Sequence, residues 1–526
     1  MGTATHPERG AFRNEPLTDF SKPENKKAME QALAKVKSEL GREYPLLIDG
    51  EEIRTGETTA SVNPSHPDQV IGRFQKGTPE HAHRAIEAAH RAFDPWKRVP
   101  AAQRAECLFR AADILRKRRF EISAWMIYEV GKTWPEADAD IAEAIDFCEF
   151  YGREMIRLSG PQPVHQVPGE KNVFVYIPLG AGAVIPPWNF PSAIPCGMTV
   201  AALVAGNTVV LKPSGDSAAI AWQLVQALYE AGIPKSALHF LTGPGSSTGE
   251  ALIADPKTRF IAFTGSKEVG LRISELAGKA PKGQIWIKRT VLEMGGKDAI
   301  IVDDEADIDA AVDGVTVSAF GYQGQKCSAC SRAIVTEKVY KEFVDKLTGR
   351  VQSIKVGPSE DPGNYMGPVI NAKALKSMEE YIEIGKKEGG KLVAGGKRAP
   401  GDGYFLEPTV IVDVKPDDRI AQEEIFGPVL AVIPAKDFDD ALKIANGTEF
   451  GLTGALFSKN PQKIARAAED FHVGNLYFNR KCTGALVGVQ PFGGFNMSGT
   501  DSKAGGQDYL LLFLQGKSLA ERLPKS

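Results

Sequence analysis

Residues 324–332 read GQKCSACSR and place Cys327 and Cys330 three positions apart, with two residues between them. This spacing is compatible with half of a zinc site, a thioredoxin-like redox pair, or one nucleophilic thiol beside a bystander. A zinc site needs a second pair of ligands, and the sequence has neither another cysteine pair nor a nearby histidine pair. A redox pair usually has an aromatic residue or proline beside it, and neither stands here. The pattern disfavours metal and redox chemistry, but the segment alone does not decide which thiol reacts.

Two glycine-rich turns are candidates for phosphate binding. Gly243–Gly249 and Gly265–Gly270 each follow a strand-like segment and precede a predicted helix. The N–H groups and the dipole at the start of a helix favour a phosphate. Neither turn has the full pattern of a dinucleotide fingerprint, so plain turn chemistry is an equal alternative. Lys212 ends another strand-like segment, where its ammonium would meet a ribose or phosphate; the alternative is an exposed lysine before a proline.

The first part of the chain predicts short strands followed by helices. Residues 45–75 are strand-like with turn residues between the strands. Thr78 is a predicted N-cap, and Pro79 occupies the first helical position after it. Apolar residues recur every three or four positions in 101–120 and 136–152, which predicts two more helices.

Beyond residue 173 the pattern predicts strands separated by helices. The strand candidates are VFVYI, AGAVI, NTVVL, HFLTG, RFIAFTG and DAIIV. Helical patterns at 217–231 and 267–279 stand between some of them. This alternation predicts a doubly wound parallel sheet, on which ligands bind at the carboxyl ends of the strands. A second alternating region covers about 300–480.

The composition excludes several classes of protein. A chain of 526 residues is too long for one hydrophobic core, so at least two domains are expected. The net charge of -3 gives no electrostatic basis for binding nucleic acid or an anionic membrane. We see no signal peptide and no apolar run near the roughly 20 residues that span a bilayer. Six scattered cysteines suit a reducing compartment, so we expect a cytoplasmic protein.

Six ordered motifs then point to a family. They are PWNFP at 187–191, LKP at 211–213, FTGS at 263–266, LEMGGK at 292–297, GQKC at 324–327 and EEIFGP at 423–428. The chain resembles the aldehyde dehydrogenase superfamily along nearly its whole length. Further stretches are similar to the branch that oxidises L-glutamate γ-semialdehyde; they are FRNEP, EVGK, EAIDF, QGQKCSA, FNRK and TGALVGVQPFGGF. The resemblance implies oxidation of that aldehyde, a small-molecule substrate, to L-glutamate, the second step of proline degradation.

The resemblance implies an α/β fold with a Rossmann-type nucleotide domain, an α/β catalytic domain and a β-flap for oligomerisation. The nucleotide domain would cover 1–160 and 178–297, and the catalytic domain 298–482. The flap and C-terminal tail would cover 161–177 and 483–526. The tail contains the apolar run DYLLLFLQ, and an apolar tail indicates a partner surface. We therefore expect a homo-oligomer, a dimer or higher.

Three catalytic residues follow from the resemblance. Cys327 matches the nucleophile, Glu293 the general base and Asn189 the side chain of the oxyanion hole. A thiolate converts an aldehyde into a tetrahedral adduct that can release hydride. The amide of Asn189 and the backbone N–H of Cys327 would stabilise the oxyanion, and Glu293 would activate the water that releases the thioester. Cys330 receives no role.

The resemblance also implies binding residues, and no metal ligands. The cofactor residues are Pro187, Trp188, Lys212, Gly245, Gly265, Ser266, Glu424 and Phe426. The substrate residues are Ser328, Gly484, Ala485, Phe190, Phe492, Glu143 and Lys326. Many members of the family have a glutamate three residues after the ribose-binding lysine, where it repels a 2′-phosphate. Here Gly215 and then Asp216 stand at that place, so we expect use of NAD and also of NADP.

Two alternatives are open at this point. One is another aldehyde oxidiser, for succinate semialdehyde or for a broad range of aldehydes. The other is a binding or structural protein on the same scaffold, because a fold does not by itself imply an activity. The semialdehyde interpretation depends on Ser328, Gly484 and Ala485, and the enzyme interpretation on Cys327, Glu293 and Asn189.

Overall fold

The first of two large sheets has a parallel core. The computed structural model describes residues 9–524. The strand order is β11 (Arg289–Glu293), β10 (Phe260–Thr264), β7 (Ala181–Ile185), β8 (Thr208–Leu211), β9 (Leu238–Phe240), β2 (Leu46–Ile48) and β3 (Glu51–Ile53). Neighbours from β11 to β9 are parallel, and β2 and β3 add an antiparallel edge. Strand β7 lies between β8 and β10, so the strand order reverses there. Ligands bind at such a switch point.

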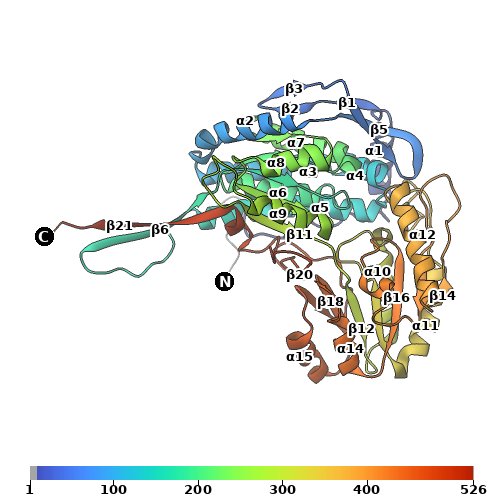
Figure 1. Ribbon diagram of the computed structural model, residues 1–526. Helices are drawn as coiled ribbons and strands as arrows, with labels where there is room; N and C mark the ends of the chain where they lie inside the picture. Colours follow the sequence, from blue (N-terminus) through green and yellow to red (C-terminus); the bar gives the residue numbers. More distant parts are fainter. Residues whose placement is uncertain (1–8, 525–526) are drawn as a thin grey trace.

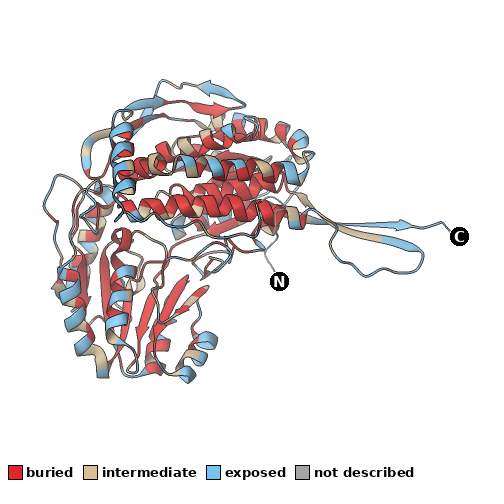
Figure 2. Cartoon of the chain, turned by 180° about the vertical axis from the view of Figure 1, so that it is seen from behind, coloured by how far each residue is buried: buried red, intermediate tan, exposed pale blue. Residues whose placement is uncertain are grey.

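Helices cover both faces of this sheet, as the strand–helix alternation predicts (Figure 1). Val209 and Leu211 of β8 belong to one apolar core, and Val210 between them belongs to another. One face is covered by α2 (Pro79–Lys97), α8 (Glu250–Ala254) and α9 (Lys267–Gly278). The other is covered by α3 (Ala101–Lys117), α4 (Arg119–Val130), α5 (Trp134–Leu158), α6 (Ala193–Val204) and α7 (Ala218–Glu230). Figure 2 shows the buried residues concentrated in these layers.

The N-terminal region agrees in part with the predictions. Helix α2 begins at Pro79, and the N–H of Thr78 donates to the ring of His81 (3.2 Å), as an N-terminal cap would require. The prediction of a single helix at 101–120 is wrong at its C-terminal end, because Arg118 separates α3 from α4. The sequence pattern does not predict α1 (Pro23–Lys37). The small sheet beside it contains β1 (Arg42–Tyr44), β5 (His66–Gln75) and β4 (Thr58–Asn63).

The second large sheet contains the C-terminal strands. Its order is β14 (Lys391–Ala394), β15 (Thr409–Val412), β16 (Val429–Ala435), β13 (Arg332–Thr336), β12 (Ala299–Val302), β18 (Thr453–Phe457) and β19 (Asn475–Phe478). All neighbours are parallel except β14 and β15. Helices α10 (Ile308–Phe320) and α11 (Glu337–Gln352) cover one face. The other face is covered by α12 (Ala372–Lys387), α13 (Arg419–Gln422), α14 (Phe438–Ala445) and α15 (Pro461–Asp470).

A two-stranded arm projects from the body of the molecule (Figure 1). It pairs β6 (Glu170–Pro178) antiparallel with β21 (Leu514–Arg522). The strand predicted at 173–177 is therefore real, but its prediction as part of the parallel sheet is wrong. The predicted strand DAIIV is also real, and it belongs to the second sheet as β12. A separate short pairing joins β17 (Phe450–Gly451) and β20 (Phe495–Asn496). Within residues 9–524 no helix has the length and apolar character to cross a bilayer.

Candidate active site

One pocket lies where the first sheet and its helices meet the loop of Cys327 and a C-terminal loop. Helices α5 and α6, the loop after β7 and the ends of β10 and β11 contribute to its wall. The predicted residues that line it are Glu143, Phe190, Glu293, Cys327, Ser328, Gly484, Ala485 and Phe492. Much of the remaining wall is apolar, with Phe147, Tyr151, Phe263 and Tyr509 among its residues. An apolar pocket with a few converging polar groups is the usual form of a ligand site.

The loop that carries Cys327 has a strained backbone. Tyr322 and Gln323, which precede it, have positive φ angles of 51° and 57°. Side chains disfavour this conformation, and it persists where the surroundings enforce it. Here the Tyr322 hydroxyl donates to the carbonyl of Val130 (3.0 Å), and the Gln323 amide donates to the carbonyl of Pro368 (2.8 Å). The sharp reversal presents Cys327 to the pocket.

The Cys327 side chain is a thiol in this environment. Burial raises its pKa well above the ordinary value, and the charges of Asp298, Glu293 and Glu424 raise it further. The N–H of Ser328 interacts with the sulfur and opposes this shift. Because only the thiolate is a nucleophile, the thiol must lose its proton before it attacks a carbonyl.

Glu293 ends strand β11 and has two different carboxylate oxygens. Oε1 accepts a hydrogen bond from the Ser502 hydroxyl (2.5 Å). Oε2 is buried and has no hydrogen-bond partner among residues 9–524. Burial raises the pKa of Glu293 to about 7. A carboxylate with this pKa and one unpaired oxygen is suited to act as a general base near neutral pH.

Asn189 follows β7 and is buried beside the Cys327 loop. Its amide nitrogen donates one hydrogen bond, to the carbonyl of Gln325 (3.0 Å). A primary amide has two N–H donors, so the second can serve an oxyanion. Gln325 is itself fixed, because its side-chain oxygen accepts from the N–H of Ile370 (2.8 Å).

Three polar groups near Cys327 make no hydrogen bonds to the described part of the chain. They are the hydroxyl of Ser328 and the N–H groups of Gly484 and Ala485. Gly484 has a φ of 76°, which glycine adopts without strain. The ammonium of Lys481 lies beside Gly484, 3.3 Å from the place of a Cβ atom. These donors and the positive charge form a candidate site for a carboxylate.

Two predicted substrate residues, Glu143 and Lys326, line different cavities. Glu143 faces the pocket from α5, and burial together with the charges of Asp140 and Asp146 raises its pKa to about 8. Lys326 is not part of the pocket wall. Its ammonium pairs with Glu136 (2.7 Å), and it lines a smaller cavity beside Glu424 and Phe426.

The predicted cofactor residues follow the strands around the switch point. Pro187 and Trp188 follow β7, Lys212 follows β8, Gly245 follows β9, and Gly265 and Ser266 follow β10. Lys212 is buried, which lowers its pKa to about 8, and within residues 9–524 its ammonium makes no hydrogen bond or ion pair. Ser266 caps α9, where its hydroxyl accepts from the N–H of Val269 (3.4 Å). A buried cation without a partner and a helix N-terminus fit the phosphates and ribose of a dinucleotide.

Glu424 and Phe426 complete this region from the other sheet. The Glu424 carboxylate accepts a hydrogen bond from the N–H of Gly296 (3.0 Å), and burial raises its pKa to about 7. A Cβ at Gly295 would lie 2.1 Å from Glu424, so a side chain there would collide with the carboxylate. The rings of Trp188 and Phe426 meet edge to face at 5.5 Å. The loop before β16 thus brings Glu424 and Phe426 into contact with Gly296 and Trp188.

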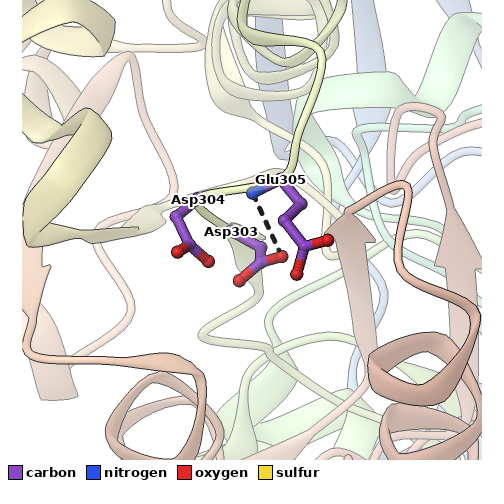
Figure 3. A group of neighbouring side chains, drawn as sticks. All are labelled: Asp303, Asp304 and Glu305. Atoms are coloured by element: carbon purple, nitrogen blue, oxygen red, sulfur yellow. Dashed lines mark hydrogen bonds between the residues drawn. The ribbon is translucent and has the colours of Figure 1, made fainter.

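Three consecutive carboxylates form a cluster at the far end of β12 (Figure 3). Asp303, Asp304 and Glu305 surround the ammonium of Lys463, which lies 2.7, 2.8 and 3.0 Å from them. The N–H of Glu305 also donates to Asp303 (3.3 Å). Because the Lys463 ammonium of α15 pairs with all three carboxylates, the cluster joins α15 to the second sheet.

Several contacts of the site have no recognisable sequence pattern. Ser502 contacts Glu293 from a loop more than 200 positions away. Lys481 ends the FNRK motif, but nothing in that motif indicates that its ammonium lies beside the Gly484 backbone. Tyr151 and Tyr509 line the pocket and stack on each other (5.3 Å). A single serine, lysine or tyrosine gives no local signal, so only the fold reveals these contacts.

Comparison with known proteins agrees with this architecture. The model of the "Aldehyde dehydrogenase family" matches residues 52–519. A "1-pyrroline-5-carboxylate dehydrogenase" of Geobacillus sp. (strain WCH70) is 54% identical over 510 residues, which cover 97% of this chain and 99% of the relative. A crystal structure of a 1-pyrroline-5-carboxylate dehydrogenase from Thermus with bound NAD has a TM-score of 0.96 and 51% identity, covering 97% and 99% of the two chains.

A more distant structure has the same fold. The betaine aldehyde dehydrogenase of Staphylococcus aureus, in complex with NAD+, has a TM-score of 0.88 and 30% identity. The match covers 95% of this chain and 98% of that one. With the family model covering most of its length and relatives above 50% identity, the chain belongs to the aldehyde dehydrogenase family.

Proposed function

We propose that the chain oxidises L-glutamate γ-semialdehyde to L-glutamate with reduction of NAD. The semialdehyde is in equilibrium with 1-pyrroline-5-carboxylate, the compound named in the relatives at 51–54% identity. The observation that carries the proposal is the group of unpaired donors at Ser328, Gly484 and Ala485 in the same pocket as Cys327. They fit the α-carboxylate of a substrate whose aldehyde carbon reaches the thiol.

Acylation begins at Cys327. The residue is partly exposed, so solvent can accept the proton of its thiol. The thiolate sulfur then bonds to the aldehyde carbon, and the carbonyl oxygen becomes an oxyanion. The second N–H of Asn189 and the backbone N–H of Cys327 are the candidate donors to this oxyanion. Release of hydride from the tetrahedral carbon leaves a thioester on Cys327.

Bound NAD supplies the acceptor for this hydride. We propose that Lys212 and Ser266 hold its ribose and phosphate groups, and that Glu424 binds the ribose nearer the reacting carbon. Lys212 and Ser266 belong to a nucleotide domain, proposed as 1–160 and 178–297, whereas Glu424 and Cys327 belong to a catalytic domain proposed as 298–482. Glu293 and Cys327, on the two sides of this proposed boundary, line the same pocket, which supports the division.

Deacylation depends on Glu293. Its unpaired Oε2 removes a proton from water, and the water oxygen bonds to the thioester carbon. The carbon–sulfur bond then breaks, which releases the product as an acid and leaves Cys327 as a thiolate. The acid ionises to its carboxylate in solvent, and Glu293 returns its proton to solvent. The product of the proposed substrate is L-glutamate, so the reaction that supplies this substrate must form a cyclic imine or its open aldehyde.

Ser328→Ala tests the substrate assignment. A carboxylate that leaves water needs hydrogen bonds in the pocket, and one bond to a charged group contributes about 1.5–3 kcal/mol, or roughly 10- to 150-fold in kcat/KM. We expect that loss for 1-pyrroline-5-carboxylate, mainly through KM. Propionaldehyde, which has no carboxylate, should react with Ser328→Ala and with the unaltered chain at similar rates. Equal losses for both substrates would show that Ser328 supports Cys327 instead of binding the substrate.

Gly215→Glu tests the use of NADP. A Cβ at Gly215 would meet nothing within 4 Å, so a glutamate fits there. The neighbouring Asp216 is half-buried and bonds to Asn371, which limits its repulsion of a 2′-phosphate. We therefore expect measurable activity with NADP. Gly215→Glu should lower kcat/KM for NADP more than for NAD, by on the order of tenfold, because like charges repel. An equal decrease for both cofactors would contradict a role of position 215 in recognising the 2′-phosphate.

We further propose that the arm joins copies of this chain. Strands β6 and β21 pair with each other outside the body, and Leu519 and Leu523 on the arm are 45% and 44% exposed. Near its base Ile285 and Ile287 are 85% and 87% exposed. Such an apolar surface usually has a partner.

Light scattering tests this assembly. The purified chain should have a molar mass that is a multiple of 56.8 kDa, and the double variant Ile285→Asp/Ile287→Asp should shift it toward a single chain. A mass of one chain for the unaltered protein at micromolar concentration would contradict the proposal.

A further inference from the structure

The loop of residues 498–503, which we call the clamp loop, bonds to strand β11 on both sides of Glu293. Met294, which follows Glu293, donates its N–H to the carbonyl of Ser498 (2.8 Å). Leu292, which precedes Glu293, accepts a hydrogen bond from the N–H of Thr500 (2.9 Å) through its carbonyl. The N–H of Leu292 donates to the Thr500 hydroxyl (3.0 Å). The backbone of the general base therefore has a fixed position relative to this loop.

The clamp loop places Ser502 through an unusual backbone. Asp501 and Lys503, its two neighbours, have φ angles of 53° and 50°, which side chains disfavour. The Lys503 ammonium donates to the carbonyls of Gly474 and Gly493, at 2.8 Å each, and fixes the end of the loop. Strained backbone that neighbouring bonds enforce is common at functional sites.

Ser502 makes direct contact with the carboxylate of Glu293. Its hydroxyl donates to Oε1 at 2.5 Å, and its N–H approaches the same oxygen at 3.4 Å. A distance of 2.5 Å is typical of a hydroxyl bonded to an ionised carboxylate. Ser502 is only 4% exposed, so water does not readily compete for this bond. One carboxylate oxygen is thus occupied, whereas Oε2 has no partner among residues 9–524.

We propose that Ser502 is a positioning residue for deacylation, holding Oε1 of Glu293 so that Oε2 accepts the proton of the attacking water. The inference rests on the proposed roles of Cys327 and Glu293 and adds a residue to them. In this step the proton passes from water to Oε2, the water oxygen bonds to the thioester carbon, and the sulfur of Cys327 leaves as a thiolate. Ser502 exchanges no proton and acts through the orientation and ionisation of Glu293.

Because of the groups around Glu293, loss of the Ser502 hydroxyl should change the pH dependence of deacylation. Burial raises its pKa, whereas the bonds from Ser502 and the charge of Lys503 lower it. Cys327, Tyr509 and Glu143 line the same pocket, and burial raises the pKa of each, so they favour their neutral forms. Without the Ser502 hydroxyl, burial is less opposed and the pKa of Glu293 rises. A larger fraction of the base is then protonated at neutral pH.

An activated ester separates deacylation from hydride transfer. Cys327 attacks the carbonyl of p-nitrophenyl acetate, p-nitrophenolate leaves, and an acetyl thioester remains that Glu293 and water hydrolyse to acetate. The burst of p-nitrophenolate reports acylation, and the steady rate that follows reports deacylation. The reaction needs neither NAD nor the amino-acid semialdehyde. If Cys327→Ala hydrolysed the ester as fast as the unaltered protein, the proposed role of Cys327 would fail and this inference with it.

Ser502→Ala should keep the burst but lower the steady rate about tenfold. The pH at which that rate is half-maximal should rise by about one unit. Ser502→Thr, which keeps a hydroxyl, should have the steady rate and the half-maximal pH of the unaltered protein. Ser498→Ala, whose hydroxyl oxygen accepts from the N–H of Gly451 and does not contact Glu293, should leave the pH profile unchanged.

Two results would overturn the inference. One is a Ser502→Ala protein whose half-maximal pH equals that of the unaltered protein, whatever its rate. The other is a Ser502→Thr protein that shifts as far as Ser502→Ala. If Ser502→Ala does not fold, Ser502→Cys takes its place, because a thiol of similar size is a weaker donor and should give a smaller shift in the same direction.

Discussion

Cys327→Ala is expected to lower dehydrogenase activity by at least about 1,000-fold, because the described pocket wall has no second thiol and a hydroxyl is a far weaker nucleophile than a thiolate. Among the described residues that line the pocket, Cys327 is the single cysteine. The measurement is NADH formation from 1-pyrroline-5-carboxylate by purified proteins of equal secondary-structure content.

Cys330→Ala is the matched control. Cys330 is three residues away and 1% exposed, its thiol donates to the carbonyl of Arg332 (3.4 Å), and it does not line the pocket. Replacing it by alanine should leave most of the activity. If Cys330→Ala were as inactive as Cys327→Ala, the two thiols would act as a pair, and the assignment of a single nucleophile would be wrong.

Glu293→Gln is expected to stop turnover after one round of chemistry. Acylation should continue, since glutamine removes a negative charge that raises the pKa of the Cys327 thiol. Hydrolysis should stall, because glutamine cannot accept a proton from water. Stopped-flow measurement should show a burst of NADH close to one per active site, followed by a steady rate at least about 100-fold below that of the unaltered chain.

The pH profile gives an independent check on Glu293. A general base acts only when deprotonated, and burial raises the pKa of Glu293 to about 7. Turnover by the unaltered chain should therefore rise with pH through about 7 and fall off below it. Glu293→Gln should lose this dependence. Loss of the burst together with turnover would place Glu293 in the acylation step instead.

The general architecture could be predicted from local patterns. Strands β7, β8 and β10 stand where apolar runs end in turn residues, and α2 begins at the predicted Thr78–Pro79 cap. Two of the family motifs, LEMGGK and GQKC, contain Glu293 and Cys327, and the structure brings both residues to one pocket. Their proposed roles as base and nucleophile come from the resemblance.

Other features depend on contacts between distant segments. The run at 173–177 alternates like a sheet strand, and only its pairing with β21 shows that it forms the arm. The left-handed residues Tyr322 and Gln323 have no distinctive composition, because bonds to other segments stabilise their conformation. Ser502 is an ordinary loop serine until the fold brings it to Glu293. Local sequence does not encode such long-range contacts in a readable form.

The most direct test of the proposed function is a comparison of kcat/KM for three aldehydes with NAD. The purified chain would be assayed with 1-pyrroline-5-carboxylate, succinate semialdehyde and propionaldehyde under the same conditions, with NADH measured by absorbance. The donors at Ser328, Gly484 and Ala485 predict that kcat/KM for 1-pyrroline-5-carboxylate exceeds both others by at least about tenfold. A kcat/KM for succinate semialdehyde or propionaldehyde equal to or above that value would contradict the assignment and indicate an aldehyde dehydrogenase of different specificity.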